Sequence, residues 1–295
     1  MFQTIKIRRY AVISILVVAV FLFFTGTTLA AINREKAEKS AILENGGVEV
    51  PILMYHSLLK NPARHNTYCI CPELFESDIN YLHNNNYKTV NMQDLINFVY
   101  DGIKLPENPV VLTFDDGHYN NVHYAESLLK QYEMKAVISV VGQFSEEFSQ
   151  SGEVNPNYSY ITWEKMREIS DSGVFEIQNH SYNMHQNQGR RLGAKKINGE
   201  SLEEYTKSLT DDLMKLQNKL FESTGIYPTT FTYPFGAISK ESDDIIKSMG
   251  FKATLSCYEG VAIVQKGKPE SLYSLKRILR PCGVSSENFF KKWKI

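Results

Sequence analysis

The stretch Val110-Val111-Leu112-Thr113-Phe114-Asp115-Asp116-Gly117 places two adjacent carboxylates directly after an apolar run that is typical of a buried strand. Neighbouring carboxylates repel each other, and the pair is tolerated where a cation neutralises one member or where burial favours its protonated form. Asp115 and Asp116 therefore indicate either reactive groups at a strand end or an ordinary Asp-Gly turn. The stretch alone leaves both interpretations open.

Short apolar runs alternate with amphipathic stretches along the rest of the chain. We predict strands over residues 50–55, 110–114, 136–141, 174–178, 229–233 and 253–256. We predict helices over residues 72–86, 95–100, 121–132, 162–170, 201–223 and 239–249, the last ending at Gly250, where a left-handed cap is natural. Strands that alternate with helices form a parallel sheet covered by helices. The fold class is therefore α/β, as a barrel or a doubly wound sheet.

The composition of the 295 residues limits the possible partners. The formal net charge is −1, and the sequence has no basic stripe, which argues against a nucleic-acid partner. About 250 residues follow the N-terminal segment, enough for one large domain or two small ones with a substantial core. An uncharged or modestly charged partner fits this balance best.

The N-terminal residues predict a membrane segment. Lys6, Arg8 and Arg9 precede a run without charge over residues 10–32, long enough to cross a hydrocarbon core of about 30 Å. A single-pass anchor would leave the remainder on the outer face of the cell membrane. A signal peptide is the alternative, because residues 28–30 resemble a small-residue cleavage site, and cleavage would release the protein. We assign residues 1–32 to this segment, 33–48 to a linker and 49–295 to the main domain.

The four cysteines do not form a metal-binding pattern. Cys69 and Cys71 are closely spaced, but no Cys/His set at zinc-finger spacing accompanies them. Outside the cell, cysteines can form disulfides. We expect structural cysteines, free or paired, at Cys69, Cys71, Cys257 and Cys282.

Three histidines follow predicted strands, as the two aspartates do. His56 follows residues 50–55, and His180 and His185 follow residues 174–178. Parallel α/β folds place reactive groups at the carboxyl ends of their strands. Five residues apart, His180 and His185 would not share a helix face, so a turn must bring them together. Two imidazoles and one carboxylate are the ligands of many hydrolytic zinc sites, whose fourth position is left to water.

Three motifs together resemble the polysaccharide deacetylase family, also called the NodB-homology domain or carbohydrate esterase family 4. They are residues 113–117, His180-Ser181-Tyr182-Asn183-Met184-His185 and Tyr233-Pro234-Phe235-Gly236, in the family's order within residues 50–290. The resemblance implies a distorted (β/α) barrel of about seven parallel strands. It also implies metal-dependent removal of acetyl groups from N-acetylated sugars.

The resemblance assigns roles to particular residues. It makes Asp116, His180 and His185 the ligands of one divalent metal ion, with zinc as the default, although cobalt, nickel and iron also suit these ligands. It makes Asp115 the general base and gives the Phe235 N–H a place in the oxyanion hole. We further expect sugar contacts from Tyr182, Tyr233 and Pro234, while His118 could line the site without an assigned role.

Three departures from the commoner family pattern point to one branch. The histidines are five rather than four apart, Thr232 stands where an arginine often begins the third motif, and residues 275–280 lack the usual late histidine. The five-residue spacing and the opening Pro51-Ile52-Leu53-Met54-Tyr55-His56 are similar to the branch that includes poly-β-1,6-N-acetylglucosamine deacetylases of biofilm matrices. In that branch the early histidine takes the acid role, which makes His56 the candidate general acid.

These assignments predict a hydrolase that removes N-acetyl groups from N-acetylglucosamine units of an extracellular or cell-wall polysaccharide and releases acetate. A catalytically silent carbohydrate-binding module remains open, because the third-motif arginine and the late histidine are missing. An enzyme acting on O-acetylated polysaccharide is a further alternative. The expected partners are an N-acetylated polysaccharide and, through the N-terminal helix, the cytoplasmic membrane.

Overall fold

Seven parallel strands close into a barrel in the computed structural model, which describes residues 30–31, 33–34 and 36–295. The ring runs β2-β12-β10-β9-β8-β7-β6 and closes where β2 pairs with β6. Of the two architectures that the order of elements allowed, the barrel is confirmed. The ring strands are β2 (Ile52–Tyr55), β6 (Pro109–Phe114), β7 (Ala136–Val140), β8 (Phe175–Asn179), β9 (Thr230–Thr232), β10 (Ala253–Glu259) and β12 (Leu275–Leu279).

Strand β6 is central to the barrel because it pairs with three neighbours. Along one edge, Ile52–Tyr55 of β2 pairs with residues 111–114. Along the other edge, β5 (Lys88–Thr89) pairs with the start of β6 and β7 with its end. All six β6 residues are buried. Burial on both faces explains why this strand reads as a continuous apolar run rather than an alternating one.

Four further short strands lie outside the ring. β1 (Gly47–Val50) pairs with β11 (Ala262–Gln265), and β3 (Ser57–Leu58) pairs with β4 (Cys69–Ile70). β3 directly follows His56, so the β3–β4 pair fixes the segment that leaves the carboxyl end of β2.

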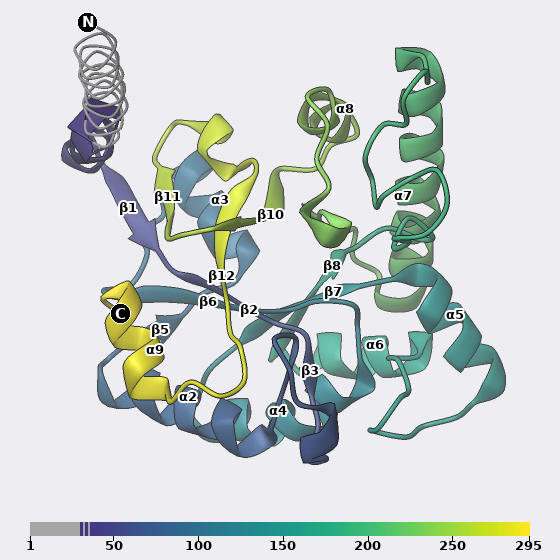
Figure 1. Cartoon of the computed structure of the whole chain (residues 1–295), viewed down its shortest axis with the longest axis horizontal. Coiled ribbons are helices and arrows are strands. Elements are labelled where there is room, and N and C mark those ends of the chain that lie inside the picture. The colour runs from purple at the N-terminus through teal and green to yellow at the C-terminus, as the bar shows by residue number, and fades with distance from the viewer. Residues whose placement is uncertain (1–29, 32, 35) are drawn as a thin grey trace, which may run out of the picture. The chain divides into compact units, whose positions relative to one another are not determined.

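Helices surround the barrel, with α2, α4 and α6 along its lower side in Figure 1. Caps explain several of their ends. A capping box of Asn91 and Asp94 begins α3 earlier than the predicted residue 95, and Gly102 ends it with a φ of 71°. Gly250 has a φ of 95°, as expected after α8. The helices are α2 (Pro72–Asn84), α3 (Met92–Asp101), α4 (Tyr119–Gln131), α5 (Gly142–Ser151), α6 (Trp163–Asp171), α7 (Leu202–Thr224), α8 (Ser242–Ser248) and α9 (Ser286–Trp293).

The apolar core lies between the ring and these helices. One cluster joins alternate strand residues such as Leu53 and Phe114 to α2, α4, α6 and α9. A second surrounds α3 and β11, and a third fills the space beneath α7 and α8. Full burial of a side chain such as Phe114 contributes about 1.5–3 kcal/mol. This packing holds the strand ends, and the side chains on them, in fixed positions.

The N-terminal part of the chain forms its own unit, Met1–Gly47, separate from Val48–Ile295. Its residues 36–44 are helical, where the sequence predicted a linker. The predicted membrane segment, residues 1–32, lies outside the described residues except at positions 30 and 31. Within the part of the chain that the structure describes, no helix combines the length and apolar character needed to cross a membrane.

Candidate active site

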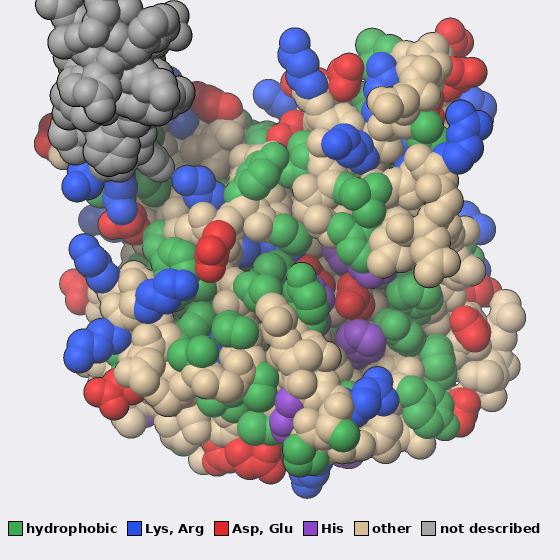
Figure 2. All heavy atoms as spheres, viewed as in Figure 1, with side chains coloured by type: hydrophobic (Ala, Val, Ile, Leu, Met, Phe, Trp, Pro, Cys, Tyr) green, Lys and Arg blue, Asp and Glu red, His purple; other side chains and the backbone are tan. Residues whose placement is uncertain are grey.

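Six of the nine predicted site residues meet in a cleft of about 810 Å³ at the carboxyl ends of the strands: His56, Asp115, Asp116, His180, His185 and Phe235. His56 follows β2, Asp115 and Asp116 follow β6, and His180 follows β8. Figure 2 shows histidine and acidic side chains together near the middle of this face. The structure therefore brings into one cleft predicted residues that lie up to 179 positions apart, from His56 to Phe235.

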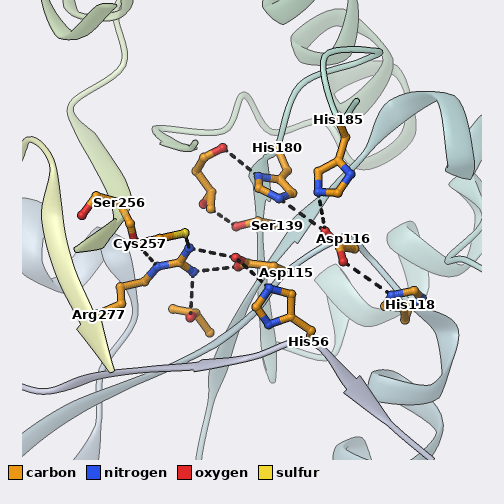
Figure 3. A network of polar contacts seen from close by, with 12 residues as sticks. His56, Asp115, Asp116, His118, Ser139, His180, His185, Ser256, Cys257 and Arg277 are labelled. Carbon is orange, nitrogen blue, oxygen red and sulfur yellow. Dashed lines mark hydrogen bonds and ion pairs between the residues drawn. The ribbon is translucent and has the colours of Figure 1, made fainter. Parts of the chain in front are cut away.

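Asp116 faces both histidines of the second motif. Its Oδ1 lies 3.0 Å from His185 Nε2 and 3.4 Å from His180 Nε2 (Figure 3). The Asp116 backbone has a φ of 71°, in the left-handed region that non-glycine residues seldom adopt. This turn directs the Asp116 side chain towards the imidazoles, while Asp115, its neighbour, points elsewhere.

The loop after β8 folds back so that His185 returns to His180, as the five-residue spacing required. Ser181 takes a positive φ of 74°, and its N–H donates to Asn179 Oδ1 at 2.8 Å. The next two backbone N–H groups both donate to Asp212 on α7. His180 is oriented separately, because its Nδ1 lies 2.7 Å from the Thr232 carbonyl oxygen. If Nδ1 carries the proton, Nε2 is left with a lone pair directed at Asp116.

This constellation fits a divalent cation. Asp116 Oδ1 is buried and, among the described residues, has no hydrogen-bond donor. One atom each from Asp116, His180 and His185 lies within 4.8 Å of the other two. Ligands at about 2.0–2.1 Å from a tetrahedral zinc ion are roughly 3.3 Å apart. The two separations from Asp116 Oδ1 match that spacing.

Electrostatics keep the Asp116 carboxylate ionised. Burial by itself would raise the pKa of Asp116, but contacts with His118, His180 and His185 hold it well below its usual range. Burial would lower the pKa of His185, but Asp116 raises it. A cation replaces the protons of such imidazoles, so the same geometry would bind a metal ion in exchange for protons.

His118 holds the other oxygen of the same carboxylate. Its Nε2 lies 3.5 Å from Asp116 Oδ2, and its ring stacks on Tyr160 with centroids 4.6 Å apart. Outer contacts of this kind orient a ligating carboxylate. The sequence placed His118 near the site but assigned it no role.

Asp115 forms a buried ion pair with Arg277, which sequence reasoning missed. The guanidinium donates to both carboxylate oxygens, at 2.7 and 2.8 Å, and its Nε donates to the Ser256 carbonyl oxygen at 2.7 Å. Burial would raise the pKa of Asp115, but Arg277 lowers it below its usual value. Arg277 on β12 thus supplies a guanidinium to the site, where the family pattern would have led us to expect one from the position of Thr232.

Replacing Arg277 with methionine should destabilise the fold. The change leaves the Asp115 charge buried without its partner, which typically costs about 3–5 kcal/mol in free energy of unfolding. Denaturant unfolding at neutral pH measures this loss. The Arg64→Met variant is a matched control, because Arg64 lines the same cleft but is exposed, and should change stability by less than about 0.5 kcal/mol. Equal effects of the two variants would contradict the assignment.

His56 lies on the opposite side of Asp115. Its Nε2 is 4.0 Å from Asp115 Oδ2, and its backbone carbonyl accepts a hydrogen bond from Asn121 Nδ2 at 2.6 Å. Burial lowers the pKa of His56, against the opposing effect of Asp115. A lowered pKa favours the neutral imidazole at neutral pH, and the role of general acid that the sequence assigned to His56 stays a prediction. Its buried Nδ1 has no partner among the described residues.

The third motif shapes the rim of the cleft. Phe235 has a φ of 57°, is exposed, and packs its ring against His185 with centroids 4.4 Å apart. Tyr233 and Pro234 are buried, and the Tyr233 hydroxyl donates to Asp243 at 2.8 Å. Burial leaves neither of them a face for a sugar, which corrects the expectation of sugar contacts there. Both residues directly follow β9, and the ring of Tyr233 packs in the core against Phe231, with centroids 4.9 Å apart.

Tyr182 lies outside this cleft. It lines a second pocket with the loop around Arg190, and Lys215 covers its ring at 3.7 Å from the centroid. The structure therefore separates Tyr182 from the six predicted site residues that line the cleft. The four cysteines are free in the structure, and among the described residues none belongs to a potential metal cluster.

The fold and the site define a barrel hydrolase whose reacting groups lie at the carboxyl ends of parallel strands. A family model described as polysaccharide deacetylase matches residues 102–254, more than half of the chain. The chain belongs to the polysaccharide deacetylase family, and it is an enzyme of that class. The resemblance that the motifs carried is confirmed.

Three known proteins show how far the similarity extends. The chain is 22% identical over 303 residues to the poly-beta-1,6-N-acetyl-D-glucosamine N-deacetylase of Staphylococcus aureus (strain MSSA476), covering 98% of this chain and 97% of that protein. The Escherichia coli (strain K12) protein of the same name is 22% identical over 245 residues; these cover 77% of this chain but only 36% of that longer protein. The solved structure of a de-N-acetylase from Aggregatibacter actinomycetemcomitans has a TM-score of 0.69 at 25% identity, covering 83% of this chain and 100% of that one.

Proposed function

We propose that this protein removes N-acetyl groups from N-acetylglucosamine units of a polysaccharide and releases acetate, with a divalent metal ion, zinc by default, at Asp116, His180 and His185. The observation that carries the proposal is the buried Oδ1 of Asp116, which lies 3.0 and 3.4 Å from two imidazole nitrogens but accepts no hydrogen bond from the described residues. A bound divalent ion would polarise the acetyl carbonyl and make water a better nucleophile. The intact constellation argues against a catalytically silent module.

Asp115 is suited to act as the general base. Arg277 keeps its carboxylate ionised and fixes its orientation, and an ionised carboxylate has about four lone-pair sites, of which the guanidinium engages two. The remaining sites can accept the proton of the attacking water. The backbone N–H of Phe235, on the rim beside His185, is our candidate donor to the oxyanion that forms at the acetyl carbonyl oxygen.

The proton then has a short route to the leaving nitrogen. His56, whose pKa burial lowers, can receive the proton that Asp115 takes from water, because its Nε2 lies 4.0 Å from Asp115 Oδ2. The protonated imidazole then donates to the sugar nitrogen as the C–N bond breaks. Water thus supplies the hydroxyl group added to the acetyl carbon and the proton added to the amine, and Asp115 and His56 return to their starting protonation states.

The His56→Ala variant tests this role. We expect the rate of acetate release to fall by about 100- to 10,000-fold, because the leaving amine loses its proton donor. Metal content should stay near that of the wild type, since His56 is not among the three grouped ligands. Metal analysis and acetate release on the same preparations measure both quantities. Loss of metal in His56→Ala equal to that in His180→Ala would make His56 a ligand instead.

The substrate proposal rests on the similarity to proteins named as poly-beta-1,6-N-acetyl-D-glucosamine deacetylases over nearly the whole chain. Acetate release measured on poly-N-acetylglucosamine, peptidoglycan, chitin oligomers and O-acetylated xylan tests it directly. We expect the first polymer to be the best substrate. Release from xylan alone would assign the enzyme to O-acetylated polysaccharide, and release from none of the four would contradict the proposal.

We also propose that the N-terminal segment anchors the protein in the cell membrane with the catalytic domain on the outer face, or releases it after cleavage. The uncharged run over residues 10–32, preceded by Lys6, Arg8 and Arg9, supports this location. An acetylated extracellular polymer would be accessible there. Fractionation of cells, followed by protease treatment of intact cells without their wall, tests the location, and recovery in the soluble intracellular fraction would contradict it.

A further inference from the structure

A row of aromatic side chains extends outward from the edge of the cleft at His118. Tyr160 stacks on His118, with centroids 4.6 Å apart and the ring planes inclined by 28°. Phe144 and Phe148 pack against Tyr160, with centroids at 4.5 and 5.6 Å, and Tyr158 follows Phe148 at 6.5 Å. We call Tyr160, Phe144, Phe148 and Tyr158 the aromatic row. It joins α5 to the segment between α5 and α6 and is continuous with the candidate active site.

The aromatic row is open to solvent, unlike the aromatic core. Tyr158 is 47% exposed and the other three rings are half-buried, whereas Phe114 beneath the site is fully buried. Figure 2 shows hydrophobic side chains beside the central histidines, on the side where Figure 1 places α5. Partly exposed aromatic rings in contact with one another beside a polar cleft are suited to bind a ligand.

Backbone contacts hold the aromatic row rigidly on the site. His118 and Tyr160 form an isolated antiparallel bridge, and the Ile161 N–H donates to the carbonyl oxygen of Gly117 at 2.9 Å. Phe144 and Phe148 lie one turn apart on the same face of α5. The aromatic row therefore has a fixed position relative to Asp116, which a preformed binding surface requires.

We propose that the aromatic row binds the sugar units next to the unit being deacetylated, and so makes the enzyme prefer a polymer over a single sugar. This inference rests on the proposed function. A pyranose unit has C–H faces that pack on aromatic rings and hydroxyl groups that meet polar side chains, such as the Tyr160 hydroxyl at the start of the aromatic row. Burial raises the pKa of Tyr160 to about 12, so this hydroxyl stays protonated and can donate. Because the aromatic row begins at the cleft, the occupant is the same polysaccharide chain.

The test compares substrates of different length on the full-length protein. The probes are a β-1,6-linked N-acetylglucosamine pentamer and 4-nitrophenyl acetate, a small ester that reaches only the reacting groups. For Tyr158→Ala and Phe148→Leu, we expect the ratio of pentamer to ester kcat/KM to fall roughly 3- to 10-fold, through a higher KM for the pentamer. Tyr158→Phe keeps the ring and should restore the wild-type ratio.

A second exposed aromatic pair provides a matched control. Phe221 and Tyr227 stack at 4.3 Å, are 43% and 48% exposed, and do not line the cleft. Tyr227→Ala should leave the pentamer-to-ester ratio unchanged. A ratio unchanged in both aromatic-row variants would overturn the inference, as would an equal fall in Tyr227→Ala. If the wild type cleaves neither probe, the proposed function fails. Calorimetric measurement of pentamer binding then tests the aromatic row separately. Weaker binding by Tyr158→Ala than by the wild type supports the inference, and equal binding overturns it.

Discussion

Asp116→Asn is expected to lose the metal ion, and its rate of acetate release should fall by about 1,000-fold or more. The reason is that a neutral amide replaces the ionised ligand between His180 and His185. The change preserves the shape of the side chain, so the fold should persist. The measurement is metal content per chain after reloading the chelated protein with zinc, with acetate release on the same samples. His180→Ala should give the same two losses.

A thermal readout separates metal binding from catalysis. A ligand that binds only the native state stabilises it by about 2.7 kcal/mol at a concentration 100 times its Kd. Zinc should therefore raise the Tm of the chelated wild type but not that of Asp116→Asn. His123→Ala is the control for loss of an imidazole, because His123 is exposed on α4 and away from the cleft. Full metal content and activity in Asp116→Asn would refute the ligand assignment.

The residues that sequence reasoning identified share a local signal. Each of His56, Asp115, Asp116 and His180 lies at the carboxyl end of a ring strand, and in a closed parallel barrel these ends all face the same side. Polar residues that follow predicted strands can therefore be expected to lie near one another in the fold, even when the order of the strands in the barrel is unknown. His185 required one more step, a turn, which Ser181 provides through its positive φ.

Arg277 could not be identified in this way. It lies within β12 rather than after it, and its partner Asp115 is 162 residues away in the sequence. Nothing local distinguishes it from Lys276 or Arg280, of which Lys276 is exposed and Arg280 binds Asp78 elsewhere. The one available signal was charge within an apolar segment, since a buried charge needs a partner, and Lys276 and Arg280 carry that signal equally. The role of Arg277 follows from its ion pair with Asp115, which only the folded structure shows.

Exposure was the other quantity that the sequence did not supply. Tyr233 and Phe235 are two positions apart in one motif, yet the first is buried and the second is 42% exposed. The chain leaves β9 at this point, and Phe235 takes a left-handed backbone conformation that turns its ring outward onto His185. Likewise α5 was not predicted, because Phe144 and Phe148 give a polar stretch only a narrow apolar face.

Asp115→Asn is expected to keep the metal ion, but its rate of acetate release should fall by about 100- to 10,000-fold, because an amide cannot take the proton of the attacking water. Asp115 is not among the grouped metal ligands. Arg277 also loses its charged partner, so the variant should be less stable, and assays must be run well below its Tm. Metal content, Tm and acetate release on one preparation distinguish these effects. Metal loss equal to that in Asp116→Asn would make Asp115 a ligand.

The double variant His56→Ala/Asp115→Asn tests whether the two residues handle the same proton. If Asp115 passes the proton of water to His56, each residue depends on the other, and removing both should cost little more than the more damaging single change. Residues that act in independent steps would instead give losses that multiply. The wild type, both single variants and the double variant therefore need kcat/KM values on one substrate. If the two single losses of kcat/KM multiply in the double variant, the proton is not transferred across the 4.0 Å gap. Asp115 and His56 would then handle different protons.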